Sequence, residues 1–388
     1  MHIHEYQGKE LLRTYGVPTP AGFACASADE AAAAAQRIGG AVWVVKAQVH
    51  AGGRAKAGGV RVARSLDDVR GHAAALLGQR LVTPRGAPGG ELVRRVLVEA
   101  GVDVLRELYV GLAIDRDSQR IVLLASGAGG VDVDDVAPQA GAGLHRAFVD
   151  AVTGLTAAQA EDAARRMELP HDALAPARDA MLALYRAFDA CDASLAEINP
   201  LALTRDHRVV ALDARLDIDP NALFRHPEIA AMHDAAEDDP DDAAAARAHV
   251  TLVPLDGDIG CLVNGAGLGM ATMDLLRLHG GAPAHLVEVG DDATAAQVVD
   301  AFAFMAQKPR QAALLVNVIG EGLACDAVAA GLVQVVRNAR LALPIVVRLK
   351  GANEGPARRI LAKSGLPVVV AHDMADAAVK AVRAAAGR

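Results

Sequence analysis

The stretch Glu197-Ile198-Asn199-Pro200-Leu201, with Asp213 shortly after it, decides the fold of this chain. We expect two short strands joined by a polar turn, with a carboxylate, an amide oxygen and a second carboxylate at their ends. Side chains alternate along a strand, so Glu197 and Asn199 face one side and Ile198 faces the other. Hard oxygen ligands of this kind suit Mg²⁺, which fills its other positions with water and nucleotide phosphates. Spacing alone equally allows a hairpin whose acidic side chains simply face solvent.

A phosphate-binding region is predicted upstream of this hairpin. The apolar strand at 41–49 contains Lys46, and a buried ammonium group needs an anionic partner such as a nucleotide phosphate. The glycine-rich loop at 51–59 follows, where backbone amides can approach phosphate oxygens closely and Arg54 adds positive charge. The order of residues is not that of a Walker A loop. By itself the loop could also be an ordinary glycine-rich hairpin tip.

Two glutamates on later strands extend the predicted nucleotide site. Glu99 ends one apolar strand and Glu107 begins the next. A carboxylate at such a position can accept a hydrogen bond from an adenine amino group or a ribose hydroxyl. A lysine on a strand, a glycine-rich flap, a strand-end glutamate and a late Asn–Asp pair follow one another in the order typical of an ATP-grasp domain.

Several longer strings resemble the β subunit of succinate–CoA ligase, and the similarity runs nearly from end to end of the chain. These strings are His4-Glu5-Tyr6-Gln7, Trp43-Val44-Val45-Lys46, Val49-His50-Ala51-Gly52-Gly53-Arg54, Glu197-Ile198-Asn199-Pro200-Leu201, Asn221-Ala222-Leu223-Phe224-Arg225 and Asn264-Gly265-Ala266-Gly267-Leu268. The malate–CoA ligase β subunit is similar too, through Tyr185-Arg186-Ala187-Phe188 and Ala231-Met232-His233-Asp234.

The resemblance implies a ligase reaction that is shared with an α subunit. ATP would phosphorylate succinate or a related carboxylic acid, a histidine of the α subunit would carry the phosphoryl group, and CoA would capture the acyl group. The residues that match the family's ATP contacts are Lys46, Gly53, Arg54, Ala55, Glu99, Val102 and Glu107. Asn199 and Asp213 would hold Mg²⁺, and Glu197 would meet the visiting histidine as the catalytic residue. The carboxylate and phosphohistidine site would contain Asn264, Glu321, Gly322 and Leu323.

The second half of the chain alternates strands with helices. Apolar strands are predicted at 260–263, 285–289, 312–318, 344–348 and 367–371. This alternation predicts a parallel sheet with right-handed crossovers, as in flavodoxin-like folds. Asn264 follows the first of these strands and opens a helix, whose backbone amides can hold an anion. The acidic run at 234–242 separates the halves, so we expect an ATP-grasp domain at 1–235 and a flavodoxin-like CoA-ligase domain at 236–388.

The composition excludes several other classes of function. The formal net charge of −8 argues against a nucleic-acid partner, and no apolar run is long enough to span a bilayer. The N-terminal residues lack the pattern of a signal peptide. The four cysteines are far apart in sequence and form no Cys-x-x-Cys pair, as in a cytoplasmic protein with reduced thiols. We therefore expect a cytoplasmic protein that neither enters a membrane nor binds nucleic acid.

Departures from the family pattern leave the acid substrate open. Three carboxylates, those of Asp291, Asp292 and Glu321, stand where the family usually has glycine or aliphatic residues. They could tune specificity, pair with arginines of the α subunit, or mark a non-catalytic subunit that has lost acid binding. Retention of the predicted nucleotide and metal residues favours the enzyme. Whether ATP or GTP is used, and whether the assembly is αβ or α₂β₂, is not determined by these residues.

Overall fold

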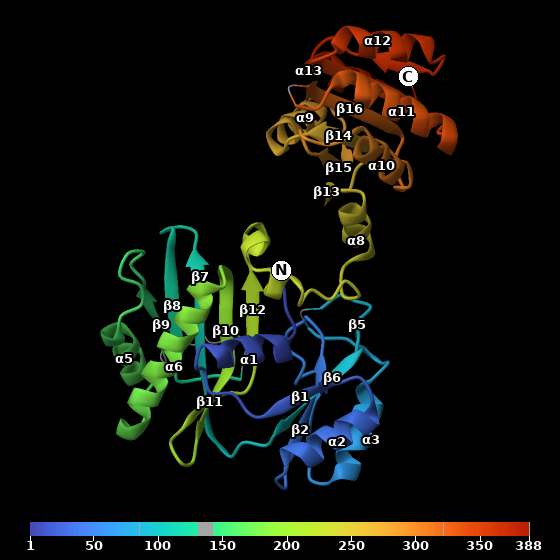
Figure 1. Cartoon of the computed structure of the whole chain (residues 1–388). Coiled ribbons are helices and arrows are strands. Elements are labelled where there is room, and N and C mark those ends of the chain that lie inside the picture. Colours follow the sequence, from blue (N-terminus) through green and yellow to red (C-terminus); the bar gives the residue numbers. More distant parts are fainter. Residues whose placement is uncertain (85, 131–142, 321, 388) are drawn as a thin grey trace. The chain divides into compact units, whose positions relative to one another are not determined.

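The computed structural model describes residues 1–84, 86–130, 143–320 and 322–387. They form two compact units, Met1–Glu237 and Asp238–Arg388, which follow one another along the colour bar of Figure 1. Each unit has its own sheets and its own buried apolar core. No described helix combines the length and the apolar composition that crossing a bilayer requires.

The smaller sheet of the first unit is antiparallel, with strand order β1-β6-β2-β3. Its strands are β1 (Gly22–Cys25), β2 (Trp43–Gln48), β3 (Val60–Ala63) and β6 (Arg95–Ala100). The helices α2 (Ala28–Ile38) and α3 (Leu66–Leu76) pack against each other and against this sheet. Both begin at a serine N-cap, Ser27 and Ser65, whose hydroxyl accepts the amide N–H of the residue three positions later. A short two-stranded pair, β4 (Arg80–Leu81) and β5 (Glu91–Leu92), lies beside them.

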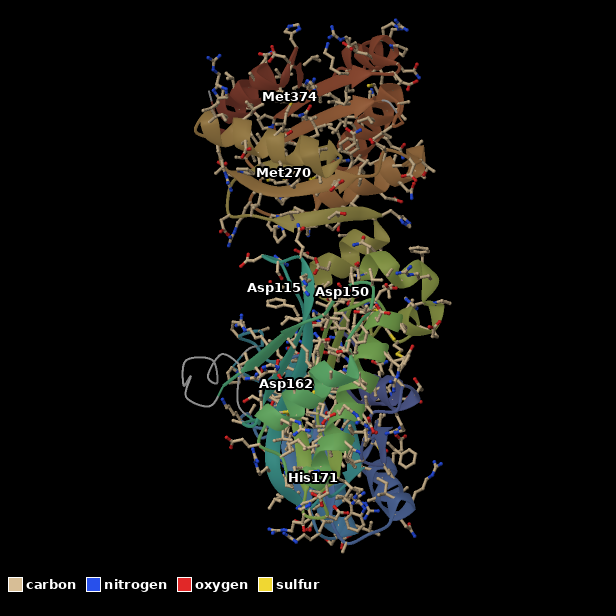
Figure 2. The ribbon with its side chains drawn as sticks, turned by 90° about the vertical axis from the view of Figure 1, so that its left-hand side faces the viewer. Asp115, Asp150, Asp162, His171, Met270 and Met374 are labelled. Carbon is tan, nitrogen blue, oxygen red and sulfur yellow. The ribbon has the colours of Figure 1, made fainter. Side chains whose placement is uncertain are left out.

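The larger sheet of the first unit has the order β11-β10-β7-β8-β9, with β12 also paired to β10. Its strands are β7 (Val104–Asp115), β8 (Arg120–Ser126), β9 (His145–Phe148), β10 (Ala193–Thr204), β11 (Val209–Ala211) and β12 (Ala214–Ile218). The helices α1 (Glu5–Thr14), α5 (Ala157–Arg166) and α6 (His171–Ala190) cover it, and the unit ends with η1 (Pro220–Arg225) and α7 (Pro227–Ala230). Figure 2 labels Asp162 on α5 and His171 at the start of α6, two helices that pack together.

One expectation about this sheet is wrong. Glu197 and Asn199 do not end a short strand, because β10 is twelve residues long and continues through both of them. The strand pairs with β12 through its first half and with β11 through its second half, and its register against β7 shifts between Ile198 and Leu201. The predicted alternation is confirmed, since Ile198 is buried while Glu197 and Asn199 are half-buried.

The second unit is a doubly wound sheet with strand order β13-β15-β14-β16-β17-β18. Its strands are β13 (Val250–Pro254), β14 (Ile259–Asn264), β15 (Pro283–Val289), β16 (Ala313–Gly320), β17 (Ile345–Gly351) and β18 (Val368–Val370). The order of the five parallel strands confirms the flavodoxin-like prediction. The edge strand β13 runs antiparallel to β15 and was not predicted.

Helices cover both faces of this second sheet. They are α8 (Pro240–Arg247), α9 (Ala266–Leu278), α10 (Ala295–Ala306), α11 (Cys325–Ala339), α12 (Glu354–Lys363) and α13 (Met374–Ala385). The helices α9 and α13 pack together against the sheet, and Met270 and Met374 mark them in Figure 2. The helices α10, α11 and α12 form a second packed layer. The loops after β14 and β16, which lead into α9 and α11, therefore meet at the carboxyl edge where the strand order reverses, the usual ligand position in such sheets.

Candidate active site

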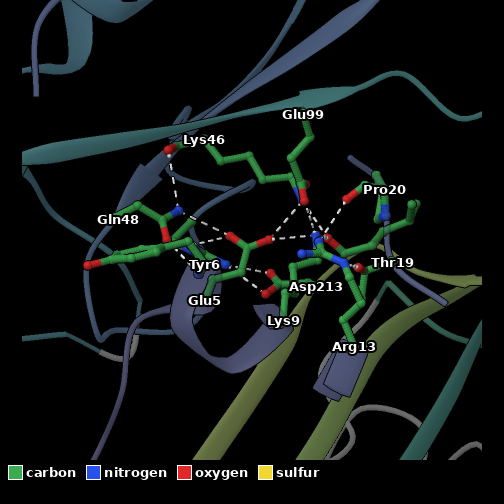
Figure 3. Close-up of polar contacts among 12 residues, drawn as sticks. Glu5, Tyr6, Lys9, Arg13, Thr19, Pro20, Lys46, Gln48, Glu99 and Asp213 are labelled. Carbon is green, nitrogen blue, oxygen red and sulfur yellow. Dashed lines mark hydrogen bonds and ion pairs between the residues drawn. The ribbon is translucent and has the colours of Figure 1, made fainter. Parts of the chain in front are cut away.

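Glu5, at the start of α1, is the centre of a buried cluster of charges (Figure 3). Its Oε1 atom accepts hydrogen bonds from Lys46 Nζ at 2.8 Å and from Lys9 Nζ at 3.2 Å. Its Oε2 atom lies 2.7 Å from Arg54 Nη1 and accepts a hydrogen bond from Gln48 Nε2 at 3.2 Å. One helical carboxylate thus holds groups that come from a strand, from the glycine-rich loop and from its own helix.

Glu99 on β6 binds the same two lysines as Glu5. Its Oε1 accepts a hydrogen bond from Lys9 Nζ at 2.6 Å, and its Oε2 lies 2.8 Å from Lys46 Nζ. Both ammonium groups also donate to the carbonyl oxygen of Leu212, at 2.6 Å for Lys9. Buried charges are stable only when they are paired and hydrogen-bonded, and this arrangement satisfies both lysines and both glutamates.

Arg54 joins the cluster to Asp213. Its Nη2 donates to both carboxylate oxygens of Asp213, at 2.7 Å each, while Nη1 donates to the carbonyl oxygen of Ala47 at 3.0 Å. The side chain of Arg54 is 7% exposed and that of Asp213 is 36% exposed. Asp213 is therefore the member of the cluster that faces open space.

The charges of the cluster stabilise one another. Burial acts to raise the pKa of Glu5, but the attraction of Arg54, Lys46 and Lys9 outweighs it and holds that pKa well below its ordinary value. Burial acts to lower the pKa of Lys46, but Glu5 and Glu99 raise it above its ordinary value. Glu5, Lys46 and Arg54 therefore all remain charged at neutral pH.

A cavity of about 420 Å³ opens beside this cluster. The seven residues predicted to bind ATP and the two predicted to bind Mg²⁺ all line it: Lys46, Gly53, Arg54, Ala55, Glu99, Val102, Glu107, Asn199 and Asp213. Lys56 adds a further cation, and Val44, Val60 and Val62 form an apolar wall. An apolar wall with a few convergent charged groups is typical of a site for a small molecule.

Glu197, the predicted catalytic residue, lies next to this cavity. It lines an adjoining space of about 120 Å³ that Arg54, Asn199 and Asp213 also line. Asn199 Nδ2 donates to Glu197 Oε1 at 3.4 Å. The structure thus places this carboxylate beside the two predicted metal ligands.

The oxygen atoms at this edge fit a magnesium ion. Asn199 Oδ1 accepts the backbone N–H of Gly130 at 2.8 Å, and both oxygens of Asp213 accept from Arg54. Amide and carboxylate oxygens are the ligands that Mg²⁺ takes, with water and phosphate oxygens in the remaining positions. The donor set is suitable, and binding an ion requires these hydrogen bonds to exchange.

The predicted carboxylate site of the second unit surrounds Asn264, at the end of β14. Its Nδ2 donates to the carbonyl oxygen of Ile319 at 2.7 Å and to Asp291 Oδ1 at 2.5 Å, and its Oδ1 accepts the N–H of Ile319 at 2.9 Å. Gly265 follows with φ of 95°, which suits glycine, and α9 begins directly after it. An acidic residue of the chain therefore already holds the amide that was predicted to face the acid.

The other three residues predicted at this site have different positions. Gly322 approaches the backbone of Asp291 so closely that an added Cβ would lie 2.6 Å from its carbonyl oxygen. Leu323 is 2% exposed and belongs to the apolar core, so any contact with a ligand is limited to its backbone. Glu321 lies outside the described residues.

Comparison with known proteins follows the same division of the chain. A family model described as an ATP-grasp domain matches residues 2–203, and one described as CoA-ligase matches residues 262–382. The chain is 52% identical to the succinate–CoA ligase [ADP-forming] subunit beta of Janthinobacterium sp. (strain Marseille), and 52% identical to that of Herminiimonas arsenicoxydans. Both alignments cover 100% of each protein. The chain belongs to the family of succinate–CoA ligase β subunits.

Family membership confirms the resemblance predicted from the sequence motifs and the predicted order of ATP-grasp and CoA-ligase folds. The solved structure of ATP citrate lyase from Methanothrix soehngenii, in complex with citrate and coenzyme A, has the same fold. It superposes with a TM-score of 0.73 at 18% identity, over 100% of this chain and 99% of that one.

Sequence reasoning missed the partners that hold the predicted residues. It assigned a phosphate to Lys46, whereas carboxylates of Glu5 and Glu99 contact the Lys46 ammonium in the structure. It also gave no role to Lys9, which is 2% exposed. The only local signal was the spacing of Glu5 and Lys9, four residues apart, which on most helices indicates an exposed pair.

Proposed function

We propose that the cavity of the first unit binds ATP together with Mg²⁺, and that the chain is the β subunit of an ADP-forming ligase that joins succinate to CoA. Family membership supports the reaction class. The observation that supports the site most strongly is that all nine residues predicted for nucleotide and metal line one cavity, although they come from segments as distant as Lys46 and Asp213.

The groups around the cavity suit phosphoryl transfer. Lys46, Arg54 and Lys56 supply positive charge where the phosphates would lie, and the apolar wall suits the base. Such fixed charges stabilise the negative charge that is spread over the transferred phosphoryl group in the transition state. Asn199 and Asp213 would hold Mg²⁺, which would neutralise further phosphate charge when bound.

The partner would be an α subunit that carries a phosphorylated histidine and binds most of CoA. Glu197 would accept a hydrogen bond from that histidine beside the nucleotide cavity and so orient its other ring nitrogen. In the second unit, Asn264 and the first amides of α9 would lie at the carboxylate and phosphohistidine site, because a helix N-terminus favours anions. The four cysteines are all free and buried, which suits a reducing, cytoplasmic location.

One observation favours a second candidate function. The hydrogen bond between Asn264 and Asp291 places a carboxylate of the chain where an acid would bind. A subunit that binds nucleotide and the α chain without activating an acid would show such a feature. The intact nucleotide cavity, with its predicted catalytic carboxylate beside it, favours the enzyme.

Coexpression with the α subunit tests the proposal. The purified complex should release ADP from ATP over many turnovers only when Mg²⁺, CoA and a carboxylic acid are all present, with succinate and malate compared directly. Without the acid or CoA, ADP release should stop after the single turnover that phosphorylates the histidine. A complex that binds Mg·ATP but releases no CoA-dependent ADP with any dicarboxylic acid would support the non-catalytic alternative instead.

A further inference from the structure

Arg54 lines the cavity proposed for the nucleotide, but its guanidinium is already bonded within the protein. Among the described residues, the Arg54 guanidinium contacts Glu5, the Ala47 carbonyl and both oxygens of Asp213. Arg54 lines the cavity, yet its donors point to these groups. A phosphate can take over the Nη1 or Nη2 donors of Arg54 only if one of the two carboxylates releases them.

The burial of Glu5 and Asp213, and the other partners of each, decide which of these two carboxylates releases Arg54. The Glu5 side chain is 2% exposed and has three other partners, Lys9, Lys46 and Gln48. The Asp213 side chain is 36% exposed, and among the described residues Arg54 is its only ion-pair partner. Freeing a buried carboxylate leaves an uncompensated charge, whereas an exposed carboxylate regains water or meets a cation. Asp213 is therefore the group that exchanges.

We propose that Asp213 makes the cavity selective for the cation-bound nucleotide over the free nucleotide, by holding Arg54 until a divalent cation takes its place. This inference rests on the proposed function, in which nucleotide and Mg²⁺ share this cavity. A free nucleotide would have to break the two contacts between Arg54 Nη2 and Asp213 and would then face the released carboxylate as a like charge. A cation that binds Asp213 removes both obstacles. Affinity for the cation and affinity for the nucleotide are therefore coupled, and the coupling is reciprocal.

Substitution of Asp213 separates this role from simple loss of a metal ligand. Asp213→Asn keeps the shape of the side chain but loses the charge that pairs with Arg54. The variant should bind a non-hydrolysable ATP analogue without any metal on the order of 10- to 100-fold more tightly than the unaltered chain, because hydrogen bonds to charged groups have about that strength. Loss of a metal ligand alone would leave metal-free binding unchanged.

The experiment is isothermal titration of the full-length chain with AMP-PNP, in excess EDTA and again in excess Mg²⁺. The unaltered chain should bind far more tightly with Mg²⁺ than without, and Asp213→Asn should lose most of that difference. Glu107→Gln is the matched control, because Glu107 lines the same cavity and no ion pair among the described residues joins it to Arg54. That control should change affinity by the same factor with and without Mg²⁺. Asp213→Ser, checked by thermal unfolding, serves if the asparagine variant does not fold.

The possible outcomes distinguish this inference from the proposed function. If the unaltered chain binds Mg·AMP-PNP but Asp213→Asn binds the free analogue no more tightly than the unaltered chain, Asp213 does not hold Arg54 back and the inference is wrong. The inference is also wrong if Glu107→Gln gains as much affinity for the metal-free analogue as Asp213→Asn does. Loss of any negative charge in the cavity would then explain the result. If the unaltered chain does not bind AMP-PNP even with Mg²⁺, the proposed nucleotide site fails as well.

Discussion

Replacement of Asp291 tests whether the chain's own carboxylate limits binding of the acid. The side-chain amide of Asn264 has two N–H groups, and the structure uses both, one for the Ile319 carbonyl and one for Asp291 Oδ1. The Asn264 side chain both donates to the carbonyl oxygen of Ile319 on β16 and accepts from the N–H of that residue, so these two bonds fix its position. The hydrogen that points to Asp291 is therefore the one that an acid could accept.

The geometry gives the size of the effect. An acid that accepts this hydrogen would sit about 3 Å from Nδ2, and it would displace Asp291 Oδ1, which lies 2.5 Å from that atom. If the displaced Asp291 carboxylate stays about 5 Å from the acid, the two like charges repel by roughly 3 kcal/mol at an effective dielectric constant near 20. Asp291 is exposed, so solvent screening reduces this value. We expect the KM for succinate to fall by about tenfold to a hundredfold in Asp291→Gly and Asp291→Asn.

Steady-state kinetics with the coexpressed α subunit measure this effect. The KM for succinate should fall while the KM for ATP stays the same, because Asp291 belongs to the second unit and the proposed nucleotide cavity to the first. Asp292→Gly is the control, since Asp292 carries the same charge next in the chain and no hydrogen bond joins it to Asn264 among the described residues. Unchanged succinate kinetics in both Asp291 variants, or an equal gain in Asp292→Gly, would refute the reasoning.

Three further predictions concern the partner, the metal and the buried cluster. The isolated chain should bind Mg·ATP in a titration but form no acyl-CoA, because in the proposed function the phosphorylated histidine and most CoA contacts would belong to the α subunit. Asp213→Ala should slow phosphorylation of that histidine by on the order of 10²–10³, the usual cost of losing one preorganised electrostatic group, as measured by transfer of labelled phosphate from ATP. Glu5→Gln should lower the free energy of unfolding at neutral pH by on the order of 3–5 kcal/mol in urea titrations, because it leaves buried cations underpaired. Folding lowers the pKa of Glu5, so this carboxylate contributes to the free energy of unfolding above its unfolded pKa near 4.3. That contribution is lost as pH falls through the folded pKa. Between neutral pH and about pH 3, Glu5→Gln should therefore lose less stability than the unaltered chain.

Each of these predictions has a result that would contradict it. Acyl-CoA formation by the isolated chain would show that the reaction does not need the α subunit. A normal labelling rate in Asp213→Ala, with the fold intact by circular dichroism, would show that Asp213 is not a ligand of the proposed Mg²⁺. Parallel pH–stability curves for Glu5→Gln and the unaltered chain would show that Glu5 has an ordinary pKa in the folded protein.

That the residues proposed for nucleotide and metal line one cavity could be predicted because they lie on strands and loops with strong local signals. Lys46 stands out in an apolar strand, Arg54 in a glycine-rich loop, and Asn199 and Asp213 near a predicted hairpin. Alternation along β10 also placed Glu197 and Asn199 on one face correctly. The length of β10 was missed because Pro200 usually ends a strand, whereas here the pairing with β7 shifts register and resumes. The edge strand β13 was missed for a related reason, since it ends in Pro254.

The partners of these residues could not be predicted, because they depend on how α1 packs against two sheets. A glutamate and a lysine four residues apart are usually a solvated pair on a helix surface. In this chain the side chains of Glu5 and Lys9 are each 2% exposed, since the helix face that carries them lies against β2 and β6. Local sequence specifies that α1 is a helix, but only the tertiary packing decides that its charged face is buried.

The balance of charge in this cluster has a consequence for how ligands bind. Three cations, Lys9, Lys46 and Arg54, face three carboxylates, Glu5, Glu99 and Asp213. A triphosphate added to such a cluster cannot simply fill positive sites, because each cation is already paired. Binding must exchange one carboxylate for phosphate oxygens, and the displaced carboxylate needs a cation of its own. The Asp213 side chain is 36% exposed, more than that of Glu5 or Glu99. In the proposed function, nucleotide and metal ion would therefore bind together, because neither alone would replace the interactions that its binding breaks.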